Sequence, residues 1–229
     1  MPVLRVNDLP IAYTERGDGP TALALHAATA SGVQMGWLAQ AVVHEGFNVV
    51  TPDLRGHGDT PNPAPDLHLP RLVDDMLEFV YLLGRAPVHG LGYSLGGAVA
   101  LYAALRRPEM FRSLVLLGSS YHAPAPERIG RVVGPEASRP PDVRAVFDPE
   151  TGVTVGWDTP LERFKAVPAP TLLICGDRDE FNDPEDNVAL YRTLPNAEVL
   201  IAPHADHLGL VRHAMVFHAL REFYTRVPR

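Results

Sequence analysis

Residues 92–96 read Gly-Tyr-Ser-Leu-Gly, which is the pattern G-x-S-x-G. The apolar run at 87–93 predicts a β-strand that enters it, and the alanine-rich run at 95–107 predicts a helix that leaves it. A serine on such a strand-to-helix turn stands above the sheet, and only small neighbours fit beside it. Ser94 is therefore a candidate nucleophile. The alternative is a glycine-rich turn with an incidental serine, which the matching order of strand, turn and helix disfavours.

The rest of the chain alternates short apolar runs with helical periodicity. Further strands are predicted at 22–26, 47–51, 113–117, 171–175 and 197–201, and helices at about 33–46, 69–83, 184–194 and 209–226. Apolar strands that alternate with helices form a parallel sheet covered on both sides. The sequence therefore predicts an α/β fold, with a mostly parallel sheet of about eight strands and helices on both faces.

Three local predictions accompany this fold. The first helix is expected to bury one apolar face, made by Val33, Trp37, Leu38, Ala41 and Val42. The first 16 residues lack the strand–helix alternation and predict a small antiparallel ribbon at one sheet edge. Residues 121–169 are rich in proline and too long for an ordinary connection. We expect one domain over residues 1–229, with 121–160 inserted as a short cap.

The composition is that of an acidic globular protein. Apolar residues make up 46% and charged residues 21% of the 229 residues, and the formal net charge is −7. These values exclude a disordered or collagen-like chain, and an acidic chain without a basic block is a poor binder of nucleic acid or anionic membranes. The one cysteine, Cys175, has no partner for an internal disulfide. Apolar runs of at most about 8 residues, against about 20 for a membrane span, predict a cytoplasmic protein with no membrane partner.

A nucleophilic serine needs a base, and the base needs an acid to orient it. On a fold of this kind the chain order is serine, then Asp or Glu, then His. Two loops that follow predicted strands supply them, Gly-Asp-Arg-Asp-Glu at 176–180 and Pro-His-Ala-Asp-His-Leu at 203–208. The candidate acids are Asp177, Asp179 and Asp183, and the candidate bases are His204 and His207.

These motifs resemble those of the α/β-hydrolase superfamily, in its branch of compact serine esterases, lactonases and cofactor-free haloperoxidases. Four motifs match in order: His-Ala-Ala at 26–28, Asp-Leu-Arg-Gly-His-Gly at 53–58, the serine turn, and the acid and histidine loops. The resemblance implies Asp179 as the acid and His207 as the base. It also implies an oxyanion hole made by the backbone N–H groups of Leu95 and Ala28.

Two features of the resemblance bear on the site. The family usually carries His-Gly where this chain has His26-Ala27, and the large aromatic residue that follows in the family is absent. The loop at 53–58 is structural in the family, and His26 is interpreted as a brace for the oxyanion loop. The small residues leave room beside the serine. The main large side chains of the cap are expected to form the pocket wall, although each could instead pin the cap to the body of the protein: Tyr121, Phe147 and Trp157.

The sequence predicts a serine hydrolase that cleaves a small-molecule carboxylic ester or lactone through an acyl-enzyme on Ser94. No metal and no organic cofactor are expected, because the histidines form no metal-ligand pair such as H-E-x-x-H. One alternative is a perhydrolase or haloperoxidase that uses the same residues with peroxide in place of water. The other is a binding or sensor protein on the same scaffold. An open, apolar pocket predicts a preference for neutral, medium-to-large groups.

Overall fold

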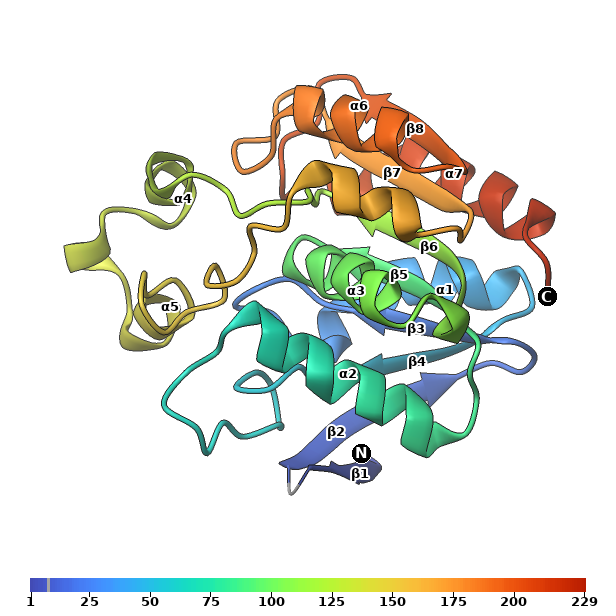
Figure 1. Ribbon diagram of the computed structural model, residues 1–229, viewed down its shortest axis with the longest axis horizontal. Helices are drawn as coiled ribbons and strands as arrows, with labels where there is room; N and C mark the ends of the chain where they lie inside the picture. The colour runs from blue at the N-terminus through green and yellow to red at the C-terminus, as the bar shows by residue number, and fades with distance from the viewer. Residues whose placement is uncertain (8) are drawn as a thin grey trace.

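One sheet of eight strands runs through the computed structural model, which describes residues 1–7 and 9–229 (Figure 1). The strand order is β1-β2-β4-β3-β5-β6-β7-β8. β1 pairs antiparallel with β2, and β2 pairs antiparallel with β4, whereas all the other neighbours are parallel. The predicted α/β fold with a mostly parallel sheet and an antiparallel ribbon at one edge is confirmed.

Most bounds lie within a few residues of the predicted ones, but the last helix begins at Ala214 rather than at about 209, because a 3₁₀ turn precedes it. The strands are β1 (Val3–Val6), β2 (Leu9–Arg16), β3 (Thr21–Leu25), β4 (Asn48–Pro52), β5 (Val88–Tyr93), β6 (Phe111–Leu117), β7 (Thr171–Gly176) and β8 (Ala197–Ala202). The α-helices are α1 (Gly36–His44), α2 (Leu69–Leu83), α3 (Leu95–Arg106), α4 (Pro126–Val133), α5 (Pro141–Val146), α6 (Pro184–Thr193) and α7 (Ala214–Arg226). The 3₁₀ turns used below are η1 (Gly32–Met35) and η5 (Leu210–Arg212).

Helices cover both faces of the sheet because the central strands are apolar on both sides. β3 and β5 are buried along their whole length. α2, α3 and α6 pack against one face, and α1 and α7 against the other (Figure 1). The sheet therefore separates two hydrophobic clusters. Among the described residues, no helix has the length and apolar character needed to cross a membrane.

The predicted face of the first helix is partly wrong. Leu38 and Val42 are buried as expected, but Val33 and Trp37 are 68% and 72% exposed. The reason is a change of helix type, because Val33 belongs to η1, whose tighter winding breaks the α-helical spacing at Gly36. The buried positions of this segment are instead Met35, Leu38, Ala39 and Val42.

Residues 121–160 lie beyond the carboxyl ends of the central strands and carry α4 and α5 (Figure 1). Backbone hydrogen bonds tie this segment to the start of α2 and the loop before it, from Leu67 N to Thr151 O at 2.6 Å and from Leu69 N to Val155 O at 3.0 Å. The side chain of Trp157 is buried, and its indole N–H donates to Ser120 O at 3.2 Å. These contacts fix the segment over the edge of the sheet where β5 ends.

Candidate active site

Ser94 sits on a strained turn between β5 and α3. Its φ and ψ are 54° and −119°, a region that residues with a side chain rarely adopt. The turn is anchored because Ser94 N–H donates to Leu117 O at 2.8 Å. It is also very tight, since a Cβ added at Gly92 would lie 2.3 Å from the carbonyl carbon of Gly96. The glycines of G-x-S-x-G are therefore required by close backbone approach.

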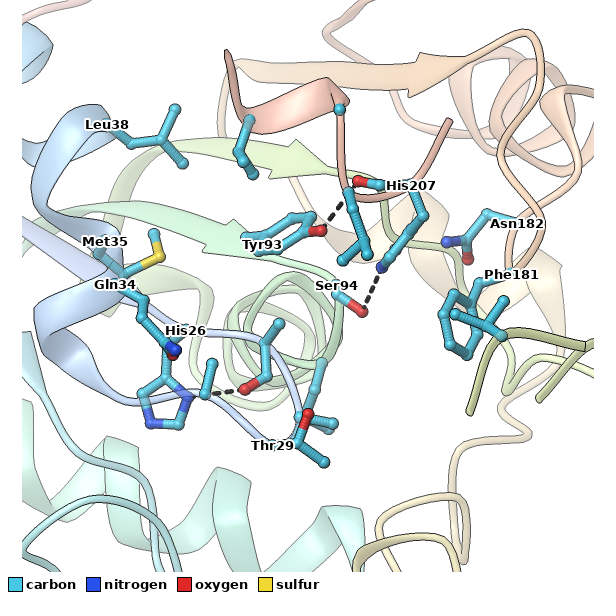
Figure 2. Close-up of a pocket in the computed structure, with 18 of the residues that line it drawn as sticks. His26, Thr29, Gln34, Met35, Leu38, Tyr93, Ser94, Phe181, Asn182 and His207 are labelled. Carbon is cyan, nitrogen blue, oxygen red and sulfur yellow. Dashed lines mark hydrogen bonds between the residues drawn. The ribbon is translucent and has the colours of Figure 1, made fainter. Parts of the chain in front are cut away.

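The structure brings Ser94, His207 and Asp179 into one hydrogen-bonded row. His207 Nε2 lies 3.1 Å from Ser94 Oγ, as Figure 2 shows, and His207 Nδ1 lies 2.8 Å from Asp179 Oδ2. The side chains of His207 and Asp179 are 4% and 0% exposed. The inner pair is therefore shielded from water, and its hydrogen bond holds the imidazole in one orientation.

The second carboxylate oxygen of Asp179 is held by the backbone. Asp179 Oδ1 accepts hydrogen bonds from the N–H groups of Phe181 and Asn182, both at 2.9 Å. The Asn182 side chain in turn donates to Gly118 O at 2.8 Å, which ties this turn to the end of β6. The carboxylate cannot rotate without losing two charge-assisted hydrogen bonds.

The other candidate acids and the other candidate base have different partners. Asp177 Oδ1 accepts from Ala205 N at 3.2 Å, and Asp183 pairs with Arg128 at 2.5 Å. His204 Nδ1 lies 2.5 Å from an Arg178 guanidinium nitrogen. None of these three groups has a hydrogen bond to Ser94 or to the His207 ring among the described residues. Of the candidate acids and bases, Asp179 and His207 are the two that the structure places in the hydrogen-bonded row with Ser94.

Two aromatic side chains that the sequence reasoning missed hold the His207 ring. Tyr93 stacks on it with centroids 5.2 Å apart and donates its hydroxyl proton to His207 O at 2.8 Å. Phe181 packs on it with centroids 4.6 Å apart. Desolvation by burial raises the pKa of Tyr93, and the nearby Asp179 carboxylate raises it further, so the hydroxyl stays a donor. The sequence hint for these contacts was that Tyr93 precedes Ser94 and that Phe181 follows Asp179 by two residues.

His26 braces the loop that follows β3, as predicted. Its Nε2 accepts from Leu54 N at 2.9 Å, so the proton resides on Nδ1 and is donated to Ala27 O at 2.8 Å. Burial, assisted by the neighbouring His57 ring, lowers the pKa of His26 to about 4. A neutral imidazole of fixed tautomer therefore joins the loop at 26–30 to the loop at 53–58.

The loop after His26 adapts to the missing glycine. The positive φ of this loop, 60°, falls on Thr29 rather than on Ala27. Ala28 lines the same cavity as Ser94 and Leu95. Leu95 is the first residue of α3, where backbone N–H groups have no acceptor within the helix. Both residues named as oxyanion donors thus border the nucleophile.

The loop at 53–58 is held by its acid and its arginine, in agreement with a structural role. Asp53 accepts from Gly32 N at 2.7 Å and from Asp59 N at 2.8 Å. Arg55 and Asp75 form a bidentate pair at 2.7 and 2.8 Å with almost no exposure. The loop is fixed directly beneath the segment that carries η1.

A cavity of about 1140 Å³ opens at Ser94 and His207. Phe147 and Trp157 line it, as the sequence predicted. Tyr121, the third residue predicted for the pocket wall, lies outside this lining. Its ring is turned against His122 and Phe164, with centroids at 4.6 and 6.4 Å.

Two further observations concern other chemistry. Within residues 1–7 and 9–229, no group of three or more His, Cys, Asp or Glu side chains is arranged to hold a metal ion. Cys175 is buried in β7, and burial raises the pKa of its thiol to about 12. The thiol is therefore a packing residue and a poor nucleophile.

Comparisons with known proteins agree with this architecture. The family model described as alpha/beta hydrolase fold matches residues 23–143. The chain is 26% identical to the sn-1-specific diacylglycerol lipase ABHD11 of Mus musculus, over 87% of this chain and 80% of the lipase. It is 28% identical to a pimeloyl-[acyl-carrier protein] methyl ester esterase of Neisseria meningitidis, over 75% of this chain and 80% of the esterase.

Among solved structures, a meta-cleavage product hydrolase from Pseudomonas fluorescens IP01 superimposes with a TM-score of 0.85. The match covers 98% of this chain and 97% of the other, at 18% sequence identity. At that identity the match shows the fold, and the choice of reaction depends on the site described above.

Proposed function

The chain belongs to the α/β-hydrolase family, and we propose that it is a serine hydrolase of carboxylic esters or lactones. The observation that carries the proposal is the row Ser94–His207–Asp179, with hydrogen bonds of 3.1 and 2.8 Å at the mouth of an apolar cavity. A serine that is hydrogen-bonded to an oriented imidazole is the arrangement that acyl transfer requires.

In the proposed reaction Ser94 Oγ attacks the carbonyl carbon, and its proton passes to His207 Nε2. The backbone N–H groups of Leu95 and Ala28 receive the negative charge on the carbonyl oxygen. The imidazolium then protonates the departing alcohol oxygen, which leaves an acyl group on Ser94. A water molecule, deprotonated by His207, releases the acid and restores the serine. Asp179 stabilises the imidazolium through both steps.

The apolar lining of the cavity and the similarity to ester-cleaving proteins support one class of substrate. The cavity walls are mostly apolar, and small residues at 27, 28 and 30 leave space beside the nucleophile. Two curated relatives are named as a lipase and as a methyl ester esterase, both of which cleave esters. We infer a neutral small-molecule ester or lactone with a medium-to-large group.

A substrate panel tests the proposal. Hydrolysis of p-nitrophenyl esters from acetate to dodecanoate and of neutral lactones is compared between the wild-type protein and Ser94→Ala. We expect turnover of neutral esters by the wild type and a loss of about 10³–10⁶ in kcat for the variant. No turnover of any ester by folded wild-type protein would favour a non-catalytic binding scaffold. Equal turnover by both proteins would place the reaction elsewhere.

A further inference from the structure

The cavity at Ser94 has walls on both sides of the sheet. Toward the cap, Phe147, Val153 and Trp157 belong to the hydrophobic cluster on the α2 and α3 face. On the other side, Met35 and Leu38 belong to the cluster on the α1 and α7 face. Figure 2 shows Met35 and Leu38 on the opposite side of Ser94 from Phe181, with Tyr93 between them and His207.

This second branch is a groove between the segment η1–α1 and the turn η5. Its floor is made by buried residues, since Met35 and Leu38 are each 2% exposed. Val211 of η5, which packs against the same cluster, lines the side facing them. The groove is thus a part of the cavity with an apolar floor, and Gln34, Gln40 and Arg212 also line the cavity on this side.

The rim of the groove carries large apolar side chains that are exposed to solvent. Val33, Trp37 and Leu208 all line the cavity, and they are 68%, 72% and 69% exposed. A ligand that covers large apolar side chains at such an edge removes apolar surface from water, and this lowers the free energy of the complex. These residues come from both walls of the groove. Val33 lies in η1 and Trp37 in the first turn of α1, whereas Leu208 follows His207 on the other side.

We propose that this groove binds the straight hydrocarbon chain of a long-chain acyl ester, which lies on Met35 and Leu38 and is covered by Trp37. The proposal rests on the serine hydrolase function and deepens it. The acyl part is assigned to the groove because it stays on Ser94 through both chemical steps, whereas the alcohol leaves after the first. An acidic protein with net charge −7 favours a neutral chain over an anionic lipid surface as the covering group.

Chain-length kinetics give the first test, with p-nitrophenyl esters kept below their aggregation limits. For the wild type we expect kcat/KM to rise about two- to fourfold per methylene between butanoate and dodecanoate. The double variant Val33→Ser, Trp37→Ser should lose about tenfold or more on dodecanoate and less than twofold on butanoate. The matched control is Tyr81→Ser, Leu82→Ser, exposed apolar residues on α2 outside the cavity lining, which should change neither value.

Fluorescence gives a second test that does not need catalysis. The chain has two tryptophans, so Trp157→Phe leaves Trp37 as the only tryptophan. In Ser94→Ala, Trp157→Phe, methyl dodecanoate should shift Trp37 emission to the blue and shield it from acrylamide, and methyl butanoate at equal concentration should not. This readout separates the groove from the reaction, because it holds even if ester hydrolysis by Ser94 fails its own test.

Four results would overturn the proposal. The first is equal loss on butanoate and dodecanoate in the rim variant, and the second is no loss on either. The third is a Trp37 shift with phosphatidylcholine vesicles but not with monomeric methyl dodecanoate, which would assign the patch to a membrane surface. The fourth is a shift with protein concentration alone, which would assign the patch to a second copy of the chain.

Discussion

Replacing Asp179 with asparagine should prevent His207 from acting as a base while leaving the fold intact. In the structure, Oδ1 accepts two backbone N–H groups, and Oδ2 accepts the proton of His207 Nδ1. An asparagine keeps its carbonyl oxygen on the two N–H groups, which turns its NH₂ toward His207 Nδ1. The imidazole must then accept at Nδ1 and carry its proton on Nε2. In that tautomer it cannot take the proton of Ser94.

The magnitude follows from the loss of the reactive tautomer. Such a change at the orienting acid of a serine triad lowers kcat by about 10⁴, or about 5 kcal/mol of barrier. Stability should change little, because both backbone hydrogen bonds are preserved. The assay is kcat for p-nitrophenyl butanoate, with urea unfolding as a check of the fold.

The matched control is Asp177→Asn, the same chemical change two residues away. The side chain of Asp177 accepts a hydrogen bond from Ala205 N through Oδ1, an atom that asparagine retains. We expect this variant to keep activity within about tenfold of the wild type. An Asp179→Asn variant that retains more than a tenth of the wild-type rate, or a larger loss in Asp177→Asn, would contradict the role of Asp179.

Three predictions concern stability, each measured by urea unfolding. Asp75→Ala should cost about 3–5 kcal/mol, because it leaves the buried charge of Arg55 unpaired, and a cost under 1 kcal/mol would contradict the pairing. Tyr93→Phe should cost about 1–3 kcal/mol through the orphaned carbonyl of His207, so an unchanged midpoint would count against that bond. His26 has a folded-state pKa of about 4 against 6.5 when unfolded, so below pH 6.5 the unfolded state binds more protons and stability falls. Its share of the loss between pH 7 and pH 5 is about 2 kcal/mol, and the slope should flatten in His26→Gln.

Local patterns were sufficient to predict most of the fold. The strands are short apolar runs, and α2 ends at Gly84 in the left-handed conformation, so pattern and capping agree with the structure. The prediction failed at Val33 and Trp37, where the chain changes from 3₁₀ to α-helix. Periodicity assumes one helix type and cannot register that change of winding.

The candidate site was predictable where a motif fixes the backbone, as at Ser94. It was less predictable where long-range packing decides. Tyr121 and Phe147 looked equivalent in sequence, yet only Phe147 reaches the cavity, because Tyr121 packs on Phe164. The groove residues Met35 and Leu38 were ordinary core positions in the sequence. They form the floor of the groove because the fold brings α1 and η5 side by side, which the local sequence does not encode.

A fluorophosphonate phosphonylates an activated serine, so the mass of the protein after this treatment is a direct test of Ser94 as the nucleophile. We expect one adduct on the folded wild-type protein, mapped by peptide sequencing to Ser94, and none on Ser94→Ala. A wild-type protein that stays unmodified, or that carries its adduct on another residue, would contradict the assignment of Ser94 as a nucleophile activated by His207 and Asp179.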